Sequence, residues 1–150
     1  MADDAMLTVR LTKRYAFAAS HRLHSPLLTD EQNRETFGKC NNPHGHGHNY
    51  EVEVTVCGEV EALTGKVVDL SVLDNLAEEQ ILRPFRFRDL NQEVPVFQTM
   101  VPTTENLAIE IDRRLRTAWS GAFQTGGPQL EKVRIRETAR NICEVQGQSK

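Results

Sequence analysis

One alternating run, from His46 to Val56, constrains the fold of this 150-residue chain more than any other feature. From Tyr50 onward every second residue is apolar, and the residues between are mainly charged or polar. A period of two residues is that of a β-strand with one buried face and one mixed face. His46 and His48 have the same parity as the valines, so we expect both imidazoles to point toward the buried face.

The rest of the chain predicts two helices set between antiparallel strands. Apolar residues recurring every four positions predict an amphipathic helix that begins at Thr103 or Thr104 and ends near Gly121. Residues 25–43 are polar and rich in turn-forming residues, which predicts a long loop, and such loops are often functional. The remaining predictions are strands at 7–23, 66–70, 132–138 and 141–145, with 66–70 in a hairpin, and a helix at 71–82.

The order β-β-β-α-α-β-β is typical of an α+β fold rather than of a parallel α/β fold. With helices on one face of the sheet, the other face is bare, and burying it against another subunit predicts an oligomer. The chain contains no repeat or linker, so we expect a single domain over residues 1–150, with residues 1–6 as a flexible tail.

Composition excludes several classes of protein. A net charge of -3 gives no basic surface for nucleic acid or membrane lipids. The acidic N-terminus lacks the features of a signal peptide, and no apolar run approaches the roughly 18 residues of a membrane span. Three widely spaced cysteines suggest neither a disulfide framework nor a Cys-x-x-Cys clip. We therefore expect a cytoplasmic protein with no nucleic-acid or membrane partner.

The histidines predict a metal site. His21 shares parity with the apolar residues of the 7–23 strand, as His46 and His48 do with those of theirs. Burying three imidazoles together without partners is costly, and a zinc ion removes that cost. Three histidines with an open fourth position are a catalytic zinc pattern. Spacing and parity alone leave the alternative that these are polar or core histidines.

Glu137 is a second unusual residue, because it shares a strand face with Val133 and Ile135. A carboxylate on an apolar face needs a partner with hydrogen-bond donors. Two interpretations remain open at this point. One is a structural ion pair with an arginine, and the other is an anchor for a ligand that presents adjacent N–H groups.

Together these residues resemble the 6-pyruvoyl-tetrahydropterin synthase family, which includes the 6-carboxytetrahydropterin synthases of queuosine biosynthesis. The matching segments run in family order and cover nearly the whole chain. They are FAASHRL at 17–23, FGKCNNP at 37–43, GHGHNY at 45–50, TG at 64–65, VDL at 68–70, TTEN at 103–106 and ET at 137–138. The spacing from Cys40 to His48 is closer to the pyruvoyl-pterin type than to the queuosine enzymes.

The resemblance implies a tunnelling fold, in which a four-stranded antiparallel sheet carries two helices on one face. Three subunits would close a barrel, and two barrels would stack into a homohexamer with sites at subunit interfaces. It also implies zinc on the three histidines and 7,8-dihydroneopterin triphosphate as substrate, in a lyase reaction that eliminates triphosphate. Glu137 would anchor the pterin ring near Thr104 and Glu105, and Cys40 would be the acid/base group.

One departure matters. Family members carry an Asp-His pair before Leu-Asn, and here Arg86 and Phe87 occupy those positions. Phenylalanine cannot transfer a proton, so the catalytic dyad is absent. His44, otherwise an ordinary loop residue, and Asp89 are candidate substitutes. The resemblance therefore leaves three outcomes: a lyase acting through zinc and Cys40, a variant reaction such as side-chain cleavage, or a pterin- and zinc-binding protein without turnover.

Overall fold

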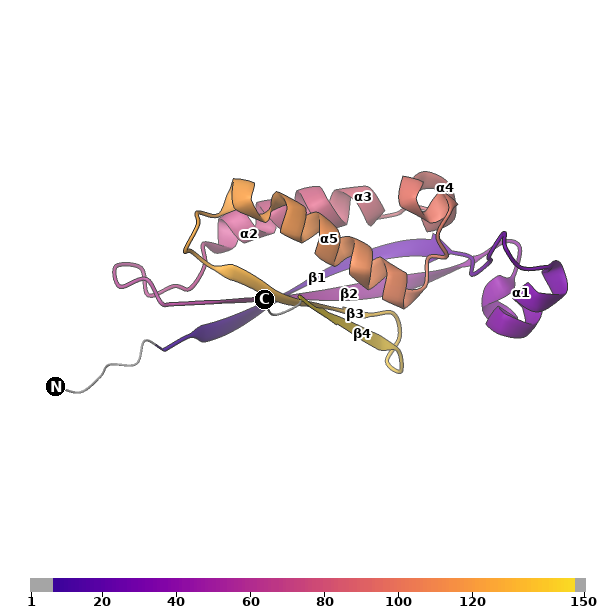
Figure 1. Ribbon diagram of the computed structural model, residues 1–150, viewed down its shortest axis with the longest axis horizontal. Helices are drawn as coiled ribbons and strands as arrows, with labels where there is room; N and C mark the ends of the chain where they lie inside the picture. Colours follow the sequence, from indigo (N-terminus) through magenta and orange to yellow (C-terminus); the bar gives the residue numbers. More distant parts are fainter. Residues whose placement is uncertain (1–6, 148–150) are drawn as a thin grey trace.

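The computed structural model describes residues 7–147, so the predicted tail at residues 1–6 lies outside the described residues. Four strands form one antiparallel sheet in the order β1-β2-β3-β4 (Figure 1), which confirms the predicted α+β fold. The strands are β1 (Val9–His21), β2 (His46–Gly58), β3 (Gln129–Arg136) and β4 (Ile142–Gln146).

The predicted strand at 66–70 is wrong. Val67 and Val68 are buried in the core without joining the sheet, and the chain then turns directly into helix α2 (Leu70–Ala77). Asp69 caps that helix by accepting hydrogen bonds from the backbone N–H groups of Ser71 and Val72. The cap favours an early helix start, so no residues remain for a returning strand.

The helical layer covers one face of the sheet (Figure 1). After α2, the chain continues through a π-helical turn, η2 (Glu78–Leu82), into α3 (Arg83–Phe85). The short α4 (Leu90–Glu93) and η3 (Pro95–Gln98) lead to the long α5 (Thr104–Ala122), which Thr103 caps. Both predicted helices are present, and their apolar residues join the fully buried valines of β2 in one core. Each such valine contributes roughly 1.5–3 kcal/mol relative to an exposed one.

The predicted loop at 25–43 contains helical structure, α1 (Asp30–Phe37) followed by the 3-10 turn η1 (Gly38–Asn41). A capping box begins α1. The Thr29 hydroxyl accepts a hydrogen bond from the Gln32 backbone N–H, and the Gln32 side-chain oxygen accepts one from the Thr29 backbone N–H. Asn33 is fully buried, and its side chain bonds to the backbone of Ser25, Leu28 and Thr29. These bonds hold the segment as a compact unit at the end of the sheet where β1 ends and β2 begins (Figure 1).

The open face of the sheet is charged rather than apolar. Arg14 and Glu53 pair at 3.1 Å across β1 and β2, and Arg134 and Arg136 of β3 lie 3.9 Å from Glu53 and Glu51. Water satisfies such groups, so this face does not by itself demand a covering subunit. The homohexamer remains a prediction.

Candidate metal centre

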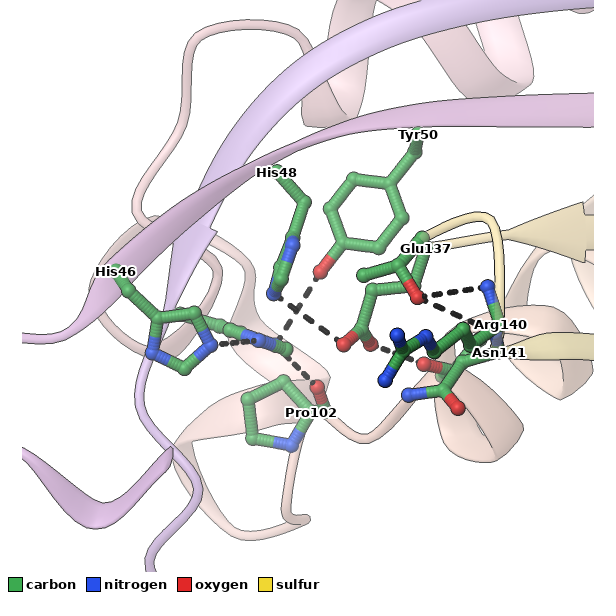
Figure 2. Close-up of polar contacts among 10 residues, drawn as sticks. His46, His48, Tyr50, Pro102, Glu137, Arg140 and Asn141 are labelled. Carbon is green, nitrogen blue, oxygen red and sulfur yellow. Dashed lines mark hydrogen bonds and ion pairs between the residues drawn. The ribbon is translucent and has the colours of Figure 1, made fainter. Parts of the chain in front are cut away.

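The pairing of β1 with β2 brings the three predicted histidines together. His21 lies opposite His46, and His48 lies opposite Ala19 on the neighbouring pair. Because side chains two residues apart on a strand share a face, His46 and His48 project to the same side of β2 (Figure 2). The centroids of the three rings lie 4.6 to 5.0 Å apart. One possible ligand atom from each residue lies within 4.8 Å of the others.

His21 is the most strongly held of the three. It is 1% exposed, and its Nδ1 lies 2.8 Å from the Pro102 carbonyl oxygen, which can only accept a hydrogen bond. Nδ1 therefore carries the proton, and the lone pair is on Nε2, 3.0 Å from Nε2 of His46. Burial lowers the pKa of His21, which favours the neutral ring that binds metals. A backbone carbonyl that orients a histidine in this way is a common feature of metal sites.

The surroundings of His48 show whether this cluster suits a metal ion. Its Nε2 is buried and makes no hydrogen bond within the described structure. The nearest polar neighbour is Glu137 Oε1 at 3.2 Å (Figure 2). Burial lowers the pKa of His48, so the ring is neutral near pH 7. A buried nitrogen without a hydrogen bond, facing two other imidazoles, is the arrangement that a bound cation would satisfy, and the donor set suits zinc.

Glu137 follows β3 and is held in place from two sides. Its backbone N–H donates to the Asn141 carbonyl at 3.0 Å, and the Thr104 hydroxyl donates to its Oε2. The side chain is 10% exposed. Among residues 7–147 no arginine lies within ion-pair distance of this carboxylate, so the interpretation as an arginine ion pair is wrong. A carboxylate beside a histidine cluster, with lone pairs remaining on both oxygens, is suited to bind a ligand with N–H donors.

Glu105 and Cys40 come from two different elements, α5 and η1. Glu105 is exposed in the first turn of α5. Burial, and to a lesser extent Glu105, raises the pKa of the Cys143 thiol. Cys40 is half-buried in η1, and its carbonyl accepts from the Leu23 N–H at 2.8 Å. Burial raises the pKa of Tyr50, with smaller contributions from Glu137 and Cys40, so Cys40 lies near the same phenol as Glu137 does.

The two candidate substitutes border one hollow of about 280 Å³ that His21 also lines. His44 is exposed in the turn before β2, where its N–H donates to the Asn42 side chain. Asp89 uses its carboxylate to cap α4, accepting from the N–H groups of Asn91 and Gln92. His44 is therefore the less constrained of the two.

Arg86 and Phe87, which occupy the positions where an Asp-His pair was expected, do not offer a proton-transfer pair. Arg86 forms an ion pair with Glu78 at 2.9 Å, and the ring of Phe87 is 80% exposed. The Phe87 backbone has φ of 58°, a left-handed conformation that a bulky residue adopts only under constraint. Its N–H donates to the Ala18 carbonyl at 2.7 Å, which supplies that constraint.

Residues 87–91 form what we call the β1 strap, which sequence analysis missed. Besides the Phe87 bond, Ser20 N–H donates to the Arg88 carbonyl at 3.0 Å. The Asn91 side chain bonds both backbone groups of Arg22, accepting from its N–H at 2.7 Å and donating to its carbonyl at 2.8 Å. The strap therefore fixes the end of β1 that carries His21. The Leu90-Asn91 pair is the only sequence signal of the strap. The strap's contacts join residues far apart in the chain, so no local pattern predicts them.

The lowered pKa values of His21 and His48 predict a pH dependence for metal-free protein. An unfolded histidine binds a proton below about pH 6.5, whereas the folded ones resist it, so the unfolded chain binds more protons. Stability is therefore complete above that pH and falls as the pH drops below it, toward the lowered folded values. We expect the free energy of unfolding, measured in urea after chelator treatment, to fall from pH 7.5 to pH 5.5. A constant value would contradict the burial of neutral imidazoles.

No helix within residues 7–147 is both long enough and apolar enough to cross a membrane.

A family model described as 6-pyruvoyl tetrahydropterin synthase matches residues 10–148. A protein of Poecilia reticulata named 6-pyruvoyl tetrahydrobiopterin synthase is 44% identical over 138 residues, covering 92% of this chain and 90% of the relative. The Homo sapiens protein of that name is 43% identical over 139 residues, covering 93% of this chain and 92% of the relative.

The solved structure of Caenorhabditis elegans 6-pyruvoyl tetrahydropterin synthase has a TM-score of 0.87 with 40% identity, covering 95% of this chain and 98% of that one. An uncharacterized protein from Wolinella succinogenes has a TM-score of 0.68 at 19% identity, over 95% of this chain and 99% of that one, and shares the fold.

Proposed function

Because the chain belongs to the 6-pyruvoyl tetrahydropterin synthase family, we propose that it is a zinc-dependent lyase acting on 7,8-dihydroneopterin triphosphate. Family membership makes it a lyase that acts on pterins. The observation that most strongly supports the finer proposal is the unpartnered Nε2 of His48, which faces His21 and His46 and lies 3.2 Å from Glu137. Metal ligands and a ring anchor thus lie side by side.

Each polar residue has a proposed role. His21, His46 and His48 would hold zinc, which when bound acidifies the substrate's side-chain hydroxyl groups. Glu137 would accept two N–H groups from the pterin ring, with its position fixed by the Thr104 hydroxyl and with Glu105 at the rim. Cys40 would move a proton on the substrate side chain, with His44 or Asp89 as the second proton-transfer group. The product would be a pyruvoyl, carboxy or shortened-side-chain pterin, in tetrahydrobiopterin or queuosine biosynthesis.

A second candidate function is pterin and zinc binding without turnover. It is favoured by the positions of Arg86 and Phe87, one paired with Glu78 and the other exposed, since neither can transfer a proton. Incubation of the purified protein with 7,8-dihydroneopterin triphosphate decides between them. We expect triphosphate release and a new pterin product. Tight binding without product at high protein concentration would support the second candidate.

Replacing Glu137 with glutamine should weaken dihydroneopterin binding about 10- to 100-fold, because one charged two-point contact is lost. The measurement is a fluorescence titration of the pterin at saturating zinc. Glu131→Gln is the matched control, because Glu131 lies on β3, the strand that Glu137 follows, but pairs with Arg10. Equal affinity of the two variants would rule out Glu137 as the ring anchor.

The proposed homohexamer is tested by sedimentation of the full chain. A stable monomer at micromolar concentration would contradict it.

A further inference from the structure

Three cations converge on a hollow of about 610 Å³ beside the proposed centre. Arg22 comes from the end of β1, Arg34 from the last turn of α1, and Lys39 from η1. Asp30 is the one carboxylate among the lining residues. We call this cavity the basic hollow. It lies at the end of the sheet where α1 is attached (Figure 1).

The cations of the basic hollow are not neutralised by the protein. Within residues 7–147, none of the three has a carboxylate within ion-pair distance, although the same structure pairs most of its other arginines. Asp30 shares the hollow but is not paired with any of them. Three cations on the wall of one cavity, without a counter-ion from the described protein, present a positive surface that attracts an anionic ligand.

Arg22 is held in place before any ligand binds. Asn91 of the β1 strap fixes its backbone on both sides, and its Nε donates to the Asn41 carbonyl at 3.1 Å. The Asn41 side chain is itself held by the Leu23 carbonyl at 2.7 Å. With Nε occupied, the terminal nitrogens of the guanidinium remain free to donate to an anion. A donor fixed in advance loses little entropy on binding.

The basic hollow adjoins the histidine cluster. Arg22 and Pro43 line both this cavity and the 280 Å³ hollow that contains His21 and His44. Cys40 lies between Lys39 of the basic hollow and Asn41, which lines it too. A ligand with one end at the histidines and Cys40 could therefore extend an anionic end toward Arg22, Arg34 and Lys39.

We propose that the basic hollow binds a polyphosphate group, namely the triphosphate end of the substrate. The identity of the ligand rests on the proposed function, whereas the affinity of the hollow for polyphosphate does not. Arginine and lysine are the residues that bind phosphate oxygens by charge-assisted hydrogen bonds, and three of them match a multiply charged chain better than a single phosphate.

Calorimetric titration of inorganic tripolyphosphate into the zinc-containing protein tests this proposal. Arg34→Gln should bind tripolyphosphate about tenfold more weakly or worse, and orthophosphate should bind far less tightly to both proteins. Arg34 is exposed, so the variant should fold normally. Arg113→Gln is the control, because Arg113 is exposed on α5 and pairs with Glu110. Zinc content is measured before and after, since stripping of the metal would affect all three proteins equally.

Kinetics provide a second readout if the protein turns over. Arg34→Gln should lower kcat/KM for 7,8-dihydroneopterin triphosphate about tenfold, because the triphosphate is both a binding group and the leaving group, on which negative charge increases as its bond breaks. Equal tripolyphosphate affinity of the wild type, Arg34→Gln and Arg113→Gln would overturn the proposal. Failure of the proposed function alone would appear differently, as tight, Arg34-dependent binding of tripolyphosphate without any turnover.

Discussion

Alanine at position 46 should abolish stoichiometric zinc binding. His46 is one of three imidazoles whose ligand atoms lie within 4.8 Å, and its Nε2 lies 3.0 Å from that of His21. Loss of a group that only orients a ligand costs roughly 10- to 100-fold in metal affinity. Loss of the ligand itself should cost more, because two histidines cannot complete a stable tetrahedral site. Elemental analysis of purified, unchelated protein measures the effect.

His44→Ala is the matched control for this experiment, since His44 is two residues away and exposed. We expect this variant to keep one zinc per chain. Its turnover also tests His44 as the replacement base, because full activity would exclude that role. A His46→Ala protein that keeps one zinc, or a wild-type protein that contains none, would refute the proposed metal centre.

Replacing Cys40 with alanine should slow triphosphate release by roughly 10²–10⁴-fold, the usual loss when a general acid or base is removed. Arg86, which pairs with Glu78, and the exposed Phe87 cannot take over the proton transfer, so the upper part of that range is expected. Zinc content should stay unchanged, because Cys40 is not among the three clustered histidines. Dihydroneopterin affinity should change little, because the Glu137 carboxylate is held by Thr104 rather than by Cys40. Stopped-flow or coupled phosphate assays give the rate.

Cys57→Ala is the control for the thiol, because Cys57 lies on β2 toward its far end, paired with Arg10 and remote from the histidines. It should retain wild-type turnover. Activity within tenfold of wild type in Cys40→Ala would show that another residue carries the proton, and Asp89 would then be the next position to change.

The parts of the centre that could be predicted from sequence all depend on strand parity. His21 and His48 were expected on the buried face because a strand alternates with a period of two whatever the rest of the protein does. Glu137 was assigned to the same face by the same rule, and its approach to His48 follows from the pairing of β2 with β3. The resemblance to a family then supplied the roles that parity cannot give.

The errors came from segments without such a period. The polarity of residues 25–43 predicts a loop, although Thr29 and Gln32 are spaced as a capping box. Polarity did not exclude a helix here, since α1 gains its stability from that cap and from the buried Asn33 rather than from an apolar face. Similarly, the apolar pattern of residues 66–70 fits a strand or the approach to a helix. The cap formed by Asp69 favours the helix, which begins at Leu70.

The sequence by itself determined the alternating strands, the amphipathic helices and the side of the sheet that each histidine faces, because those properties depend on neighbours along the chain. Only the tertiary structure decided that the Pro102 carbonyl sets the tautomer of His21, that the β1 strap holds Arg22, and that Arg22, Arg34 and Lys39 surround one hollow. Each of these contacts joins segments that are distant in sequence, and their approach is fixed by packing of the whole chain rather than by any local pattern.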